Sequence, residues 1–198
     1  MSNPEKRNYE KDVHVFLAFL RKKYNPDKKP RTLRRVVKFD EDLNILRREC
    51  ESIGGYWRIH RTVNKRSTKK AFKLLQHYLL EHPECAPYVD SQWKTILLQP
   101  ECRAERRFML DVDFKDATNI QEILKFLESQ NKFIIESKET PNGFHLITDP
   151  FNRELFKFDN VTVLTDGYIF IEEIGREHIL DEMVKENQES GLYDKTKI

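Results

Sequence analysis

Residues that mark several classes of protein are scarce in this sequence. Only three of its 198 residues are cysteines, and this odd number argues against a disulfide-stapled secreted domain and favours a reducing, intracellular location. No apolar stretch is long enough to span a bilayer, and the first residues lack the apolar core of a signal peptide. The sequence therefore predicts a protein without membrane contact, in the cytoplasm of its cell, or of the host if it is viral.

A large net charge is also missing. The chain has 35 Lys and Arg against 33 Asp and Glu, so its total charge does not indicate a nucleic-acid binder. The charges are clustered, however, because region 31–73 is basic and the acids concentrate after residue 111. Thirteen Phe, seven Tyr and a hydrophobic fraction of 38% argue against disorder. One compact domain, with or without a helical addition, is expected.

Hydrophobic periodicity predicts four helices before residue 130 and a fifth at the C-terminus. Residues 9–22 carry Val13, Phe16, Leu17 and Leu20 at the i, i+3, i+4, i+7 spacing of an amphipathic helix. Further helices are expected after Asp40, after Ser67 and after Thr118, each of which is a suitable N-cap. The helix after Thr118 would bury Ile120, Ile123, Leu124 and Leu127. A last helix is expected within the C-terminal tail.

Strand signals dominate the second half of the chain. Alternating or apolar runs bounded by turn residues predict strands over 56–67, 107–116, 132–138, 144–148, 161–164 and 168–174. The fold class is therefore α+β. We divide the chain into an N-terminal helical region (1–55), a core (56–175) and a C-terminal helix and tail (176–198).

The strand within RFMLDVDFKD, residues 107–116, carries the strongest chemical signal. One face would hold Phe108, Leu110, Val112 and Phe114, and the other Met109, Asp111 and Asp113. Two carboxylates held side by side repel each other unless a cation lies between them. Ligands that are all oxygen favour Mg²⁺ or Mn²⁺ over zinc. The alternative is that both acids lie on the solvated face of an edge strand.

Two further polar residues follow at strand ends. His145 comes directly after a Pro-Asn-Gly turn, and Asp166 lies in LTDG between the last two strands. Each has a structural alternative, because a lone histidine is often a core residue and Asp-Gly is a common hairpin turn. His82, Cys85 and Cys102 have the ligand types for zinc, but their spacing is irregular.

In this order the three features resemble the three motifs of the archaeo-eukaryotic primase superfamily, which includes primase-polymerases. FMLDVD matches the first motif, GFH with His145 the second, and VTVLTDG with Asp166 the third. The family usually has Ser where Gly143 stands, and Glu172 or Glu173 could replace Asp166 as the third acid. The resemblance covers roughly residues 56–175.

The resemblance implies an RRM-like antiparallel catalytic sheet packed on an N-terminal α/β unit. It also implies template-directed nucleotidyl transfer with two Mg²⁺ or Mn²⁺ ions and a nucleoside triphosphate. Asp111, Asp113 and Asp166 would be the catalytic metal ligands, and His145 would donate a hydrogen bond to the nucleotide's phosphates. Gly143 would let the backbone approach the triphosphate, since it has no Cβ.

The basic stretch 58–73 is interpreted as the nucleic-acid side of the site. We expect Arg61, Asn64 and Arg66 to face the nucleotide or template. The residues expected to contact nucleic acid are Tyr56, Trp57, Arg58, Lys65 and Lys69. Arginine and lysine suit phosphate contacts, and aromatic rings suit base stacking. The alternative is an ordinary solvated helix face.

The resulting hypothesis is a small primase-polymerase-like nucleotidyltransferase that acts on a single-stranded or primed template. A helicase or another replication protein is a possible partner. Two other functions stay open: a metal-dependent nuclease, and a non-catalytic RRM-like module that holds single-stranded nucleic acid. Replacement of Asp111 and Asp113 by Ala would abolish synthesis in an enzyme but would leave or improve the affinity of a passive module.

Overall fold

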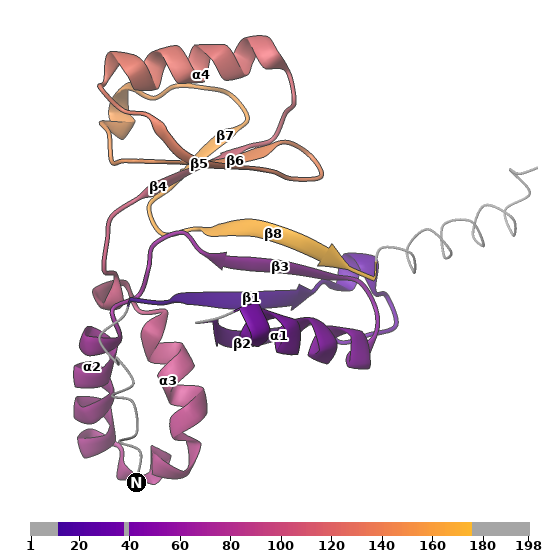
Figure 1. Cartoon of the computed structure of the whole chain (residues 1–198), viewed down its shortest axis with the longest axis vertical. Coiled ribbons are helices and arrows are strands. Elements are labelled where there is room, and N and C mark those ends of the chain that lie inside the picture. The colour runs from indigo at the N-terminus through magenta and orange to yellow at the C-terminus, as the bar shows by residue number, and fades with distance from the viewer. Residues whose placement is uncertain (1–11, 38–39, 176–198) are drawn as a thin grey trace, which may run out of the picture.

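A computed structural model describes residues 12–37 and 40–175. The predicted C-terminal helix and tail, residues 176–198, lie outside the described residues. Within the described ranges the chain forms two antiparallel four-stranded sheets and four α-helices, which confirms the α+β class (Figure 1). No helix in these ranges combines the length and the apolar character needed to cross a membrane.

The first sheet draws its strands from both ends of the described chain. Its order is β2-β1-β3-β8, with bounds β1 His14–Leu20, β2 Arg31–Val37, β3 Trp57–Thr62 and β8 Tyr168–Ile174. Helix α1 (Asp40–Ile53) covers one face, where Leu46 and Cys50 are buried against β1. Helices α2 (Thr68–Glu81) and α3 (Val89–Leu97) pack against each other and against the other side of β1 (Figure 1).

The helix predicted over residues 9–22 is wrong, because residues 14–20 form strand β1. Val15, Leu17 and Ala18 are all buried, and the strand is covered on both faces by helices. A strand buried on both faces has a continuous apolar sequence. Such a run also satisfies the helical spacing, so periodicity could not distinguish the two. The predicted helical region 1–55 therefore holds two strands of the first sheet.

The second sheet lies between α3 and β8 in the sequence. Its order is β5-β6-β4-β7, with bounds β4 Phe108–Val112, β5 Ile134–Glu139, β6 Phe144–Thr148 and β7 Val161–Leu164. Helix α4 (Ala117–Ser129) covers the face of this sheet that points away from the first sheet (Figure 1). Short 3₁₀ helices complete the fold: η1 Lys22–Tyr24, η2 Pro83–Tyr88, η3 Pro100–Cys102 and η4 Arg153–Leu155.

Strand β4 alternates as predicted. Leu110 and Val112 pack with Ile123 and Leu127 under α4, whereas Met109 points to the other side and joins a buried cluster between the sheets with Val63, Ile147 and Ile169. The same alternation places Asp111 and Asp113 on the side that faces the first sheet, where they line a cavity. The second sheet thus carries its acids toward the junction.

Two details of α4 differ from the prediction. Its N-cap is Asp116, whose side chain accepts a hydrogen bond from the Asn119 N–H at 3.0 Å, and not Thr118. Leu124 is 41% exposed, so it lies outside the buried stripe. The N-cap of α2, in contrast, is Ser67 as predicted.

Candidate functional site

A cavity of about 490 Å³ opens at the junction of the two sheets. Its size falls within the range of small-ligand sites, about 300–1,000 Å³. The acidic side is formed by Asp111 and Asp113 of β4 and its continuation, and by Asp166 in the β7–β8 turn. His145 of β6 lies in the same lining. The four residues predicted as catalytic therefore meet in one cavity.

The first sheet and its edges supply another wall, next to the β5–β6 turn at Thr140, Pro141 and Asn142. This wall holds two cationic side chains, an imidazole and three aromatic rings: Arg21, Arg58, His60, Phe19, Tyr168 and Phe170. Of these, Arg58 was predicted to contact nucleic acid, and His60 belongs to the basic stretch 58–73 interpreted as the nucleic-acid side of the site. Phe19 and Arg21 were missed because the β1 segment has the spacing of a helix, and Tyr168 and Phe170 were missed because nothing in the β8 sequence marks these two rings as part of a site. No signal in the sequence places Phe19 and Tyr168 beside the acids.

His145 is fixed by contacts to both sheets. It lies directly opposite Asp111 in the β4–β6 register, and its Nε2 is 3.3 Å from Asp111 Oδ1. Its Nδ1 accepts a hydrogen bond from the backbone N–H of Phe170 in β8 at 2.8 Å. A nitrogen that accepts is unprotonated in the neutral ring, so the proton is assigned to Nε2. The ring therefore presents an N–H donor beside the acidic pair.

Asp111 and Asp113 have little to neutralise them. The side chain of Asp111 is 37% exposed, and among the described residues its carboxylate pairs with the imidazole of His145 alone. Asp113 is exposed, and within the described ranges its carboxylate has no ion pair. Two carboxylates in this arrangement attract a cation.

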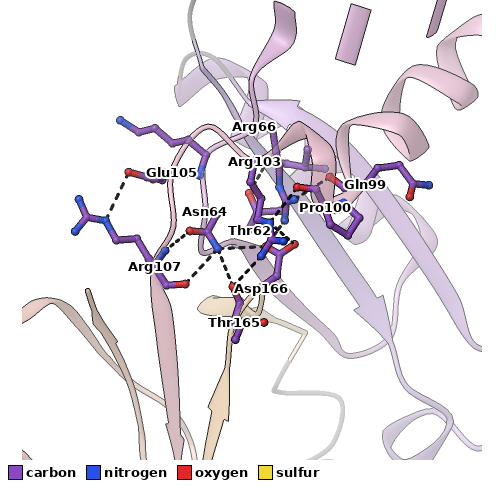
Figure 2. A network of polar contacts seen from close by, with 12 residues as sticks. Thr62, Asn64, Arg66, Gln99, Pro100, Arg103, Glu105, Arg107, Thr165 and Asp166 are labelled. Carbon is purple, nitrogen blue, oxygen red and sulfur yellow. Dashed lines mark hydrogen bonds and ion pairs between the residues drawn. The ribbon is translucent and has the colours of Figure 1, made fainter. Parts of the chain in front are cut away.

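Asp166 is held by a polar network instead (Figure 2). Its Oδ1 accepts from Arg66 Nη2 at 2.6 Å and from Asn64 Nδ2 at 3.3 Å. Its Oδ2 is 3.9 Å from Arg103 Nε. Two guanidinium groups thus surround a single carboxylate.

These contacts decide how well a metal fits. Magnesium is commonly bound by one or two carboxylates together with substrate phosphates and water, and Asp111 with Asp113 fits that pattern. No cluster of three or more His, Cys, Asp or Glu side chains suited to a metal ion occurs among the described residues. The structure does not bring Asp166 into one ligand group with Asp111 and Asp113. The same finding gives no support to zinc at His82, Cys85 and Cys102.

Two aromatic residues expected to stack on bases are buried. Trp57 is 0% exposed, and its indole N–H donates to the carbonyl of Gly54. Tyr56 is 4% exposed, and its hydroxyl donates to Glu173. Burial, together with the Glu173 hydrogen bond, raises the pKa of Tyr56 to about 12. The stacking prediction for both is wrong, because each ring belongs to the interior of the first sheet.

The residues expected to face a nucleotide have other partners. Arg61 pairs with Glu136 of β5, its Nη2 donating to Glu136 Oε1 at 2.6 Å, and so joins the two sheets. Asn64 and Arg66 are 0% and 1% exposed. None of the three lines the cavity. The prediction that Asn64 and Arg66 face a ligand is wrong, because both are buried in the network around Asp166.

The remaining predicted contacts are distributed around the site. Arg58 lines the cavity; it pairs with Glu173 at 3.4 Å and lies over the ring of Tyr24. Lys65 and Lys69 are exposed outside the cavity, and their contact with nucleic acid stays a prediction.

Gly143 is required for a different reason from the one expected. A Cβ at this position would lie 1.8 Å from the backbone oxygen of Val112. The glycine therefore lets β6 begin close against the end of β4, and it does not line the cavity.

His60 is a buried imidazole in the cavity wall. Its ring packs edge-on against Phe19 and Phe170, and its Nδ1 has no hydrogen-bond partner in the described structure. Burial, and then the neighbouring His145, lower the pKa of His60 to about 4. The group is neutral at physiological pH.

Comparisons with known protein families, with curated proteins and with solved structures found no match.

Proposed function

We propose that this protein is a divalent-metal-dependent nucleotidyltransferase of the primase-polymerase type, acting on a single-stranded or primed nucleic acid. The observation that carries the proposal is that Asp111, Asp113, His145 and Asp166 line one cavity between two sheets. These residues come from three separate segments of the chain. The resemblance to the archaeo-eukaryotic primases implies that these four side chains lie in one site.

The topology of the second sheet also supports the proposal. Its elements follow the order β4, α4, β5, β6, η4, β7, which is a β-α-β-β-x-β pattern with a 3₁₀ turn in place of the second helix. The first and third strands are central and adjacent. RRM-like sheets are built in this way, and the acids here lie on the face that α4 does not cover.

The cavity offers the chemistry that nucleotidyl transfer needs. Asp111 and Asp113 would hold a divalent ion, which when bound stabilises charge on the attacking and leaving oxygens. The Nε2–H of His145 would donate to a phosphate oxygen as charge develops there. Arg21 and Arg58 line the same cavity and suit the remaining phosphate charge. Phe19 and Tyr168 suit a base or sugar, because aromatic rings stack on nucleobases.

A passive binding module is the competing function. It is favoured by one observation, namely that no three-ligand metal group forms within the described ranges. Its aromatic and basic wall would hold single-stranded nucleic acid without chemistry.

A single assay separates these functions. Labelled primed and unprimed templates are incubated with ribo- or deoxyribonucleotides and with Mg²⁺ or Mn²⁺. The double variant Asp111→Asn/Asp113→Asn tests the acids, and Asp90→Asn, an exposed acid on α3, is the matched control.

The proposal expects extended or new strands from the wild type and Asp90→Asn, and none from the double variant. Shortened strands that depend on the same acids would indicate a nuclease. Binding of the template with unchanged strand length, in all three proteins, would contradict the proposal and favour the module.

A further inference from the structure

We infer that Asp166 is a positioning residue that clasps the two sheets together, and that it is not a ligand of the metal held by Asp111 and Asp113. The statement about the metal rests on the proposed function. The clasp rests only on contacts among described residues.

The arginine that Asp166 neutralises is buried. Arg66 is 1% exposed, and its Nη2 lies 2.6 Å from Asp166 Oδ1, whose side chain is 20% exposed. A guanidinium group this far from water needs a carboxylate partner, since an unpaired buried charge is strongly destabilising. The Nε of Arg66 already has no hydrogen-bond partner, so Arg66 depends on Asp166 and on the carbonyl of Gln99.

The network around Asp166 lies where the chain passes between the two sheets. Asn64 and Arg66 directly follow β3 of the first sheet, and Asp166 lies in the turn that leads from β7 back to β8. The side chain of Asn64 accepts from the Arg107 N–H at 2.6 Å, just before β4, and donates to the Thr165 carbonyl at 3.2 Å. The network thus joins the chain at both crossings between the sheets (Figure 2).

The charges around Asp166 disfavour a divalent cation. Arg66 and Arg103 bring two positive charges to the single negative charge of Asp166. A divalent cation drawn to this carboxylate would meet a net positive surrounding. It would also take the carboxylate away from Arg66 and leave that charge uncompensated in the interior.

The acidic pair differs on each of these points. Asp111 is 37% exposed and contacts an imidazole, and neither Asp111 nor Asp113 pairs with an arginine in the described part of the chain. A metal there would draw its other ligands from phosphates and water. Asp166 would contribute by keeping the β7–β8 turn in place, since the Gly167 carbonyl accepts from the Val63 N–H at 3.0 Å and both cavity walls meet there.

The test compares the full chain with four variants: Asp166→Ala, Asp166→Asn, Asp113→Asn, and the double variant Arg66→Leu/Asp166→Ala. Three quantities are measured: the melting temperature, the affinity for Mn²⁺ by electron paramagnetic resonance with a non-hydrolysable nucleotide analogue, and the separate kcat and KM for the nucleotide. Asp149→Ala is the control, because its ion pair with Arg107 is half exposed.

We expect Asp166→Ala to lower the melting temperature by about 10 °C, because Arg66 loses its partner. The double variant should recover at least half of that loss, since the unpaired charge is gone. Asp149→Ala should shift it by less than about 3 °C. Below its melting temperature Asp166→Asn should keep Mn²⁺ affinity within about threefold of wild type while KM rises roughly tenfold.

The inference is overturned if Asp166→Asn loses Mn²⁺ affinity and kcat as severely as Asp113→Asn, or if Asp166→Ala melts with the wild type. If Asp166→Ala does not fold, the recovery in the double variant still decides the clasp. If the wild type binds no Mn²⁺ in the presence of the analogue, the proposed function is contradicted. The melting temperatures would still test the clasp.

Discussion

Two sets of carboxylates face the same cavity and differ in what neutralises them. Asp166 is surrounded by Arg66 and Arg103 and lies in a buried network. Asp111 and Asp113 are more exposed, and a neutral imidazole is the closest polar partner of Asp111. The same residue type thus stabilises the fold at one side of the cavity and is left free for a cation at the other. The sequence motif alone does not separate these roles.

The largest expected effect is at Asp113. Asp113→Asn should lower the rate of primer extension by at least about a thousandfold, because a metal ligand is lost. Its melting temperature should stay within about 2 °C of wild type, or rise, because repulsion with Asp111 is relieved. Extension rates and thermal denaturation of the same preparations check this, with Asp90→Asn alongside. A large loss of stability would erase the contrast with Asp166.

His145 should show the next largest effect. His145→Phe removes the Nε2–H donor beside Asp111 and leaves the Phe170 N–H without its acceptor. We expect kcat/KM for the nucleotide to fall by about a hundredfold. Steady-state kinetics measures this, and His77→Phe is the control, since His77 is 73% exposed on α2. An unchanged kcat/KM would mean that His145 only joins the sheets.

The buried imidazole of His60 in the cavity wall should make the stability of the protein depend on pH. His60 has its pKa lowered from 6.5 to about 4 in the folded chain. As the pH falls, the imidazole of the unfolded chain is therefore protonated before that of the folded chain. Stability contributed by the neutral ring is present above pH 6.5 and is lost as the pH falls toward 4. Between pH 7 and pH 5 the free energy of unfolding should fall by about 2 kcal/mol on account of His60.

Chemical denaturation of wild type and His60→Phe at both pH values measures this loss. The fall in the free energy of unfolding between pH 7 and pH 5 should be smaller in His60→Phe than in wild type, and it should be unchanged in His77→Phe. Part of this pH dependence will persist in His60→Phe, because burial and the nearby Arg61 lower the pKa of His14 to about 4 as well. An equal fall in the free energy of unfolding in wild type and His60→Phe would show that His60 is protonated as easily in the folded chain as in the unfolded chain.

Arg103 should have the smallest effect. Its Nε is 3.9 Å from Asp166 Oδ2, and both side chains are partly exposed, so the pair contributes about 1 kcal/mol or less. Arg103→Gln should therefore lower the melting temperature by no more than about 3 °C, compared with the exposed control Arg106→Gln. A loss as large as that of Asp166→Ala would mean that Arg103, and not the buried Arg66, is the main partner.

The sequence allowed most of the second sheet to be predicted. Alternation in β4 placed Leu110 and Val112 inward and the two acids on the opposite face, because one face of this sheet is covered by α4. The turn before β6 and the cap of α2 at Ser67 were also predictable, since local residues determine them.

The predictions that were wrong concern features that depend on contacts between distant segments. Strand β1 is apolar on both sides because helices cover both faces of its sheet, which its own sequence does not reveal. Trp57 looked available for stacking but fills the core. Arg66 and Asp166 are 100 residues apart, so the pairing that changes the role of the third acid has no local signal.

The most direct measurement is a crystal structure of the full chain with Mn²⁺ and a non-hydrolysable nucleoside triphosphate, with anomalous scattering recorded at the manganese edge. We predict a manganese peak within about 2.5 Å of carboxylate oxygens of Asp111 and Asp113, with phosphate oxygens as further ligands and Asp166 still paired with Arg66. A peak bound by Asp166, or triphosphate in the cavity with no manganese at the Asp111/Asp113 pair, would contradict it.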